Sequence, residues 1–188
     1  YSAITSRGTG FRYLPEGCIF DKGGPSINLK SDIPEILALL NTNVAKYYFW
    51  VFNPSINLQV KDVKNFPVIL SHDDNVVEMA KTNLNYCKED WDSQETSWDF
   101  LHHPLLRRVS TIAEAFKQWQ NECDIRFNRL KANEEELNRI FISIYGLNNE
   151  VSSDVEDRDV TVHRADLKEE IRSFISYAVG CMFGRYSL

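Results

Sequence analysis

Glycine and proline divide the first 70 residues into short apolar pieces, and this division most limits what the chain can fold into. The pieces at residues 3–5, 11–14 and 18–20 lie between glycine-rich or proline-bearing turns, and each is too short for an amphipathic helix. Residues 26–29 alternate polar and apolar side chains, as a half-buried strand does. These pieces predict a small, curved, mostly antiparallel sheet.

One helix is expected to pack on this sheet. Asp32 is a candidate N-cap, and Pro34 is tolerated in a first helical turn. Apolar residues then recur at helical spacing as far as Val51, with a candidate break at residues 41–43. The Asn53-Pro54 pair ends the helix. The last two predicted strands of the sheet are residues 56–60 and 66–70.

The chain changes character after residue 70, where helical periodicity becomes continuous. Residues 110–130 place apolar side chains on one face, and residues 133–136 resemble a capped helix start. We therefore predict an α+β fold, with a recognition module at residues 1–70 and a helical support and docking region at residues 71–188. The helices expected in the second region are residues 73–89, 110–130, 133–145 and 165–183.

Charge is unevenly distributed between these two regions. Residues 1–70 carry seven Lys/Arg and five Asp/Glu, a net charge of +2. Residues 71–188 carry 14 against 22, a net charge of −8. A basic front and an acidic rear fit a protein that presents one face to a polyanion, although chance produces such a distribution as well.

Cysteine usage and hydropathy bear on where the chain works. The four cysteines are far apart in sequence, so no C-x-x-C zinc or redox motif is present. Cys18 and Cys181 lie in apolar runs and are expected to be buried free thiols, which favours a reducing compartment and hence the cytoplasm. No signal peptide and no membrane-spanning run are found. Because the chain opens at Tyr1 in strand-like sequence, we expect a piece of a larger protein.

Two stretches superficially resemble known binding or catalytic motifs. Residues 7–10, Arg-Gly-Thr-Gly, look like a phosphate-binding loop but lack the helix that such loops precede. They predict either a tight hairpin turn or a contact of Arg7 with DNA. Residues 52–55, Phe-Asn-Pro-Ser, partly match the N-P-P-[YF] motif of amino-methyltransferases. Since Ser55 and Ile56 replace the second proline and the aromatic ring, we reject a catalytic site there.

No other stretch predicts catalysis or metal binding. Residues 154–159 are rich in carboxylates but lack the glycine and the closing glutamate of an EF-hand. His102 and His103 have no third ligand nearby in sequence. No serine or cysteine occupies a nucleophile elbow. Any function must therefore be argued as recognition.

Polar residues in the first region are the candidates for that recognition. Asn and Gln side chains can read adenine bidentately, and Lys and Arg side chains hold phosphate. An ordinary exposed β-face would carry similar residues, so both interpretations stay open. Ser26 and Lys64 lie beside the candidates in sequence. The candidate DNA-binding residues are Arg7, Lys22, Asn28, Lys30, Asn57, Gln59 and Lys61.

Several separated stretches resemble one family. They include residues 6–15 (SRGTGFRYLP), 17–26 (GCIFDKGGPS), 53–60 (NPSINLQV), 91–100 (WDSQETSWDF) and 171–186 (IRSFISYAVGCMFGRY). These stretches look like the C-terminal target-recognition region of PglX-type adenine-specific DNA methyltransferases, which belong to the phage-resistance systems called BREX. A weaker likeness is to the specificity subunits of type I restriction systems.

This resemblance implies a specificity piece of an enzyme. The family's N-P-P-Y motif and its glycine-rich cofactor motif are both missing from the sequence. The resemblance therefore implies a non-catalytic piece, with S-adenosylmethionine bound by a catalytic domain elsewhere. The implied partners are double-stranded DNA, the enzyme's own upstream methyltransferase domain and other defence-system proteins. The alternative is a protein-interaction module that docks other components of the defence system.

Overall fold

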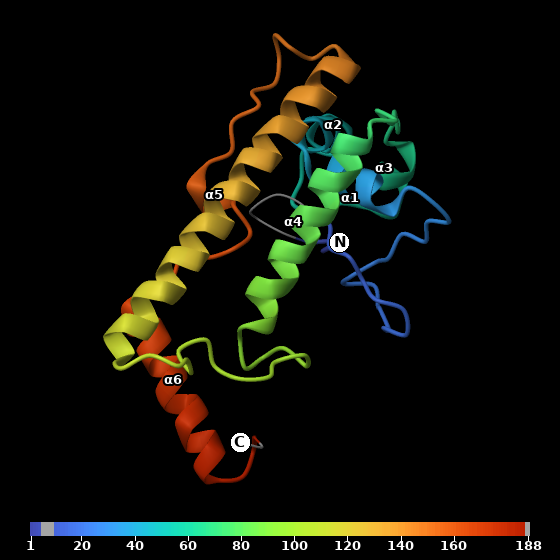
Figure 1. The fold of residues 1–188 in the computed structure, drawn as a ribbon. Helices are drawn as coiled ribbons and strands as arrows, with labels where there is room; N and C mark the ends of the chain where they lie inside the picture. Colours follow the sequence, from blue (N-terminus) through green and yellow to red (C-terminus); the bar gives the residue numbers. More distant parts are fainter. Residues whose placement is uncertain (5–9, 187–188) are drawn as a thin grey trace. The chain divides into compact units, whose positions relative to one another are not determined.

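The structure is a computed structural model that describes residues 1–4 and 10–186. The secondary-structure elements of the described residues are helices, joined by irregular segments (Figure 1). The one β-pairing among the described residues is an isolated antiparallel bridge between Ile4 and Asn57. The elements are α1 (Ile33–Asn41), α2 (Asn43–Phe52), α3 (Val60–Asn65), α4 (Asp74–Asp92), α5 (Ile112–Tyr145), a 3-10 helix η1 (Asp157–Asp159) and α6 (Leu167–Met182).

The predicted α+β fold with its curved antiparallel sheet is wrong. Most side chains of residues 12–30 are exposed, so the predicted strands bury no common face. The backbone of Phe11 bonds to a helix side chain, not to a strand. Its N–H donates to Oδ1 of Asn41 at 2.9 Å, and its carbonyl accepts from Nδ2 of the same residue at 3.1 Å. One amide side chain thus replaces a sheet partner.

The segment after α3, predicted as a closing strand, is held in the same way. The hydroxyl of Tyr145 donates to the carbonyl of Pro67 and accepts from the N–H of Ile69. The N–H and the hydroxyl of Ser71 both donate to Oε1 of Glu35, each at 2.6 Å. Residues 56–60, also predicted as a strand, contain a bend at Ile56, the isolated bridge at Asn57 and the first residue of α3, Val60. In both the Phe11 segment and the segment after α3, side chains of helices form hydrogen bonds with backbone groups that a neighbouring strand would otherwise bind.

The candidate break at residues 41–43 is a real helix boundary. Thr42 adopts an extended conformation between α1 and α2. Its Oγ1 donates to the carbonyl of Leu39 at 2.6 Å and accepts from the N–H of Ala45 at 3.4 Å. One threonine therefore ends the first helix and caps the second. The predicted stop at Asn53 is confirmed, because α2 ends at Phe52.

The helices of the second region follow the predictions except at residue 133. A break was expected there, but α5 runs without interruption for 34 residues. The side chain of Asn133 does not cap a helix, since its Nδ2 donates to Oδ1 of Asn83 at 2.8 Å. The stop at Gly146 is confirmed, with a φ of 69° that favours glycine. None of the described helices is both long and apolar enough to span a membrane.

The chain divides into two compact units. Unit 1 contains residues 1–84 and 133–155, and unit 2 contains residues 85–132 and 156–188. Unit 1 thus holds the whole predicted recognition module together with the beginning of α4 and the end of α5. The functional boundary at residue 70 stays a prediction.

Each unit has its own hydrophobic core. In unit 1, α1, α2 and α3 gather around the beginning of α4 and the end of α5 (Figure 1), with Leu39, Val44 and Phe141 fully buried. In unit 2, Trp119 and Cys123 of α5 are buried with partly buried Phe174 of α6 beside them. Cys18 was predicted to be buried and is exposed instead, because no sheet covers its segment.

Candidate functional site

A polar loop at residues 53–57, between α2 and α3, is held by its own side chains. The Nδ2 group of Asn53 donates to the carbonyl of Asn57 at 2.7 Å and to Oδ2 of Asp62 at 2.9 Å. Its Oδ1 accepts from the Ser55 hydroxyl at 2.7 Å. Both hydrogens and the oxygen of this amide are therefore engaged inside the molecule. The amide that resembled a catalytic motif is a structural clamp of this 53–57 loop.

Asp62 holds this loop in place through hydrogen bonds to its carboxylate. Its side chain lies in the first turn of α3, and the residue is only 3% exposed. Besides the Asn53 amide, Oδ2 accepts from the N–H of Gln59 at 3.0 Å. A buried carboxylate is tolerated when such donors satisfy it, and its charge also suits a helix N-terminus. The loop and the start of α3 are thus fixed by one acidic group.

The first residues of the chain join this loop to the glycine turn at residues 22–25. The N–H of Ala3 donates to the carbonyl of Gly23 at 3.1 Å, and the N–H of Leu58 donates to the carbonyl of Ala3 at 2.9 Å. The bridge between Ile4 and Asn57 continues this pairing. Segments that carry Lys22 and Asn57 therefore both contact residues 1–4.

The structure places the predicted contact residues as follows. Lys22 and Asn57 lie in the joined segments, with Gln59 and Lys61 at the beginning of α3. No hydrogen bond among the described residues ties Asn28 or Lys30 to this group. Arg7 lies outside the described residues. The six that the structure describes, namely Lys22, Asn28, Lys30, Asn57, Gln59 and Lys61, are all exposed.

Four exposed lysines of residues 1–70 differ electrostatically from the cations of unit 2. Among the described residues, Lys22, Lys30, Lys61 and Lys64 form no ion pair. In unit 2, seven of the twelve lysines and arginines are paired with carboxylates, namely Lys88, Arg107, Arg126, Lys131, Arg158, Arg164 and Arg172. Ion pairs therefore compensate less of the positive charge in residues 1–70 than in unit 2, although unit 1 as a whole carries nine Lys/Arg and 13 Asp/Glu.

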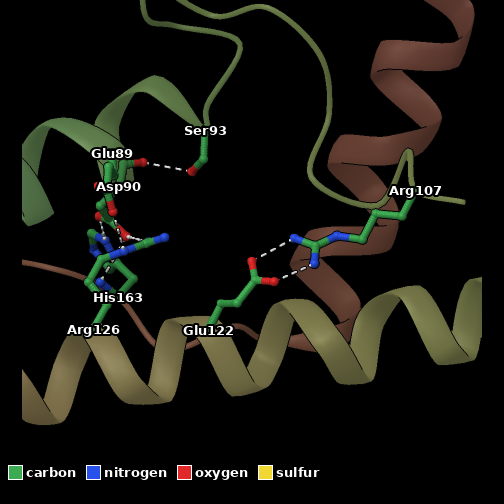
Figure 2. Close-up of polar contacts among 7 residues, drawn as sticks. All are labelled: Glu89, Asp90, Ser93, Arg107, Glu122, Arg126 and His163. Carbon is green, nitrogen blue, oxygen red and sulfur yellow. Dashed lines mark hydrogen bonds and ion pairs between the residues drawn. The ribbon is translucent and has the colours of Figure 1, made fainter.

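Unit 2 contains a denser polar cluster that the sequence did not reveal (Figure 2). Buried Asp90 contacts Nη1 of Arg126 at 3.4 Å and the ring and backbone nitrogens of His163 at 3.3 and 3.4 Å. Arg107 binds both oxygens of Glu122, at 2.6 and 2.8 Å. The partners come from α4, α5 and two loops, so no spacing within one helix announces them.

Trp119 completes this cluster and shows that it is structural. The guanidinium groups of Arg107 and Arg126 lie 5.6 and 5.2 Å from its ring centroid. Both cations are thus held between an indole and a carboxylate, an arrangement that joins elements of unit 2 together. The described residues contain no group of three or more histidines, cysteines or carboxylates placed to hold a metal ion.

His103, for which the sequence predicted no metal site, is a core residue. It is fully buried beside the ring of Phe174, with centroids 5.2 Å apart. Its Nδ1 accepts from the N–H of Leu105 at 3.1 Å, which fixes a neutral tautomer. Burial lowers the pKa of His103 to about 4. The ring is therefore uncharged in the folded protein near neutral pH.

The chain is similar over its whole length to two curated proteins. It is 43% identical over 196 residues to an adenine-specific methyltransferase PglX of Lacticaseibacillus casei strain Zhang. It is 30% identical over 210 residues to an adenine-specific methyltransferase BrxX of Escherichia coli O9:H4 strain HS. No protein-family model matches the chain. The chain spans 16% and 17% of the length of these relatives. It is thus homologous, from end to end, to one segment of the PglX and BrxX adenine-specific methyltransferases.

Proposed function

We propose that this chain is a non-catalytic DNA sequence-recognition segment of an adenine-N6 DNA methyltransferase that serves a phage-defence system. The observation that carries the proposal is the set of exposed lysines in residues 1–70 that form no ion pair among the described residues. The homology to adenine-specific methyltransferases supports it. The recognition module is residues 1–70, and residues 71–188 support it.

The loop geometry suits base recognition. Asn57 and Gln59 are exposed beside a backbone that internal hydrogen bonds already hold in place. A preorganised loop loses little conformational freedom on binding, so more of the contact energy appears as affinity. In this account Asn57, Gln59 and Asn28 read base edges in the major groove, while Arg7, Lys22, Lys30 and Lys61 hold phosphates.

Methyl transfer is assigned to another part of the complete enzyme. The Asn53 amide is occupied by Asn57, Asp62 and Ser55, so it has no free group to hold a flipped adenine. The sequence also lacks a glycine-rich cofactor motif. S-adenosylmethionine would therefore bind in a catalytic domain on the same polypeptide. The partners are double-stranded DNA, that domain and other defence-system proteins, and the site of action is the cytoplasm.

The salt dependence of DNA binding tests the proposal. Affinity for duplex DNA that contains the methylated motif should fall linearly with salt on logarithmic axes, because lysine contacts release counterions. Lys61→Gln should reduce the slope by about one unit. Lys117→Gln, at an exposed lysine of α5 that forms no ion pair among the described residues, is the matched control and should leave the slope unchanged. Binding that does not depend on salt, or an equal effect of both variants, would contradict the proposal.

One feature of unit 2 favours a second role in protein docking. Trp98 is completely exposed, and the stretch around it, residues 89–101, contains five carboxylates and no lysine or arginine. An exposed indole in an acidic stretch suits a protein surface better than DNA.

A further inference from the structure

The loop that follows α4 presents a tryptophan without any cover. Trp98 is 100% exposed, and Leu101 and Trp91, three and seven residues away in sequence, are 81% and 54% exposed. Leaving so much apolar surface in water forgoes about 25 cal/mol for each Å² that burial would remove. Large exposed apolar groups of this kind mark interaction sites more often than scattered small ones do. We call residues 93–101 the Trp98 loop.

The loop is fixed on its α4 side by a closed polar network. The hydroxyl of Ser97 donates to Oδ1 of Asp92 at 2.7 Å, and the N–H of Asp99 donates to that hydroxyl at 3.1 Å. Nζ of Lys88 binds Asp92 at 2.7 Å and Asp99 at 2.6 Å. Hydrogen bonds to these two carboxylates raise the pKa of Lys88. Both residues that flank Trp98 are therefore held, while Trp98 is not.

The other side of the loop is fixed to the C-terminal part of unit 2. Glu95 accepts hydrogen bonds from the hydroxyls of Ser176, at 2.8 Å, and Tyr186, at 3.0 Å. The ring of Phe100 packs against Tyr177 and Tyr186, with centroids 5.7 and 5.6 Å apart. The exposed indole thus projects from a rigid support. Interface hot spots are often such aromatic anchors, presented with little ordering left to occur on binding.

The charge of the loop decides what kind of partner it fits. Residues 89–101 contain five carboxylates and no lysine or arginine. Four of them share two cations from outside this stretch, Glu89 and Asp90 with Arg126, and Asp92 and Asp99 with Lys88. The fifth, Glu95, accepts its hydrogen bonds from neutral hydroxyls. A polyanion such as DNA would be repelled here. The complementary surface is an apolar pocket bordered by lysine or arginine side chains, which is a protein surface.

The greater length of the two relatives supports a complementary surface on the same polypeptide. The chain matches only 16% and 17% of its two relatives, so most of each methyltransferase polypeptide lies outside the matched segment. A site on the same polypeptide is available at high effective concentration. We propose that the Trp98 loop docks into a basic-rimmed apolar pocket on the remaining part of the methyltransferase polypeptide. This inference rests on the methyltransferase assignment but not on DNA reading by residues 1–70.

Site-specific photocrosslinking of the full-length gene product tests this proposal. The variant Trp98→Bpa carries p-benzoylphenylalanine (Bpa) at position 98. Because this position is fully exposed, the replacement should not disturb the core. After irradiation, peptide mapping should find an intramolecular crosslink to a peptide outside this chain that carries apolar residues beside lysine or arginine. The yield should fall several-fold between low and molar salt, because screening weakens the charged rim.

Trp50→Bpa is the matched control, since Trp50 is 68% exposed on α2 of unit 1, a helix whose sequence contains no aspartate or glutamate. Its crosslink to the same peptide should be at least about fivefold weaker, a ratio that corresponds to roughly 1 kcal/mol of preference.

Four results would overturn the proposal: a crosslinked dimer, which indicates a second copy; a crosslink to DNA; a crosslink to a separate protein; or no crosslink at Trp98. The proposed function is tested separately by the salt slope of DNA binding, so either idea can fail alone.

Discussion

At the scale of single residues, Asp62 has the largest expected effect on the candidate site. Its buried carboxylate accepts from the Asn53 amide and from the Gln59 backbone. Asp62→Ala leaves two donors without a partner, so we expect a loss of about 1–3 kcal/mol in the free energy of unfolding. Urea denaturation followed by circular dichroism measures this loss. Lys64→Ala, at an exposed position of the same helix, should change the free energy by less than about 0.5 kcal/mol.

His103 should make the stability of the protein depend on pH. Its pKa is about 4 in the folded state because burial disfavours the charged ring, and the ordinary value in an unfolded chain is 6.5. Between these values the unfolded state binds a proton that the folded state does not. His103 therefore does not lower the free energy of unfolding above about pH 6.5. As the pH drops towards 4, its protonation in the unfolded state lowers that free energy by about 3 kcal/mol in total.

The variant His103→Asn isolates this contribution. An asparagine oxygen can accept from the N–H of Leu105 as Nδ1 does, but it does not titrate. The free energy of unfolding of the wild-type protein should fall more steeply between pH 7 and pH 4.5 than that of the variant. Equal slopes would show that His103 is not the group responsible.

At the scale of elements, helix side chains replace the missing sheet. Asn41 holds both backbone groups of Phe11, 30 residues away in sequence. Asn41→Ala should therefore release this segment and cost about 1–3 kcal/mol of stability. Hydrogen exchange should speed up at the Phe11 amide. Asn65→Ala, at the exposed end of α3, provides the control, and protection of Phe11 that survives in Asn41→Ala would contradict the clamp.

The same clamps explain which elements could be predicted from the sequence. Helical periodicity and the Asn53-Pro54 stop are local signals, and they located α1, α2, α4 and α6 correctly. Strand-like composition is also local, but a sheet needs paired edges. Here the backbone partners are Asn41, Glu35 and Tyr145, between 30 and 78 residues away. No pattern within a short window reveals such partners.

The candidate site shows a similar division between local and long-range information. The sequence identified the polar residues beside the 53–57 loop, and the structure shows that the described ones are exposed. The sequence did not identify Asp62 as the buried anchor, because a single aspartate among polar neighbours is expected to be exposed to solvent. The prediction of a helix break at residue 133 was wrong for a related reason. The side chain of Asn133 donates a hydrogen bond to Asn83 of α4, a distant partner, and does not cap a new helix.

At the scale of the whole molecule, the account depends on a contrast in charge. Cations of unit 2 are mostly paired with carboxylates, whereas Lys22, Lys30, Lys61 and Lys64 form no ion pair among the described residues. Residues 1–70 have a net charge of +2, and the other residues of unit 1, 71–84 and 133–155, carry two Lys/Arg and eight Asp/Glu. We expect the basic region to meet DNA and the acidic Trp98 loop to meet protein.

The most direct test is a genome-wide map of N6-methyladenine in cells that carry the full-length gene. It is compared with the map from the same gene in which residues 1–70 are exchanged for those of a relative that methylates another motif. The account predicts that the methylated motif changes to that of the donor. Methylation that persists at the original motif after the exchange would show that sequence recognition lies elsewhere and would contradict the central claim.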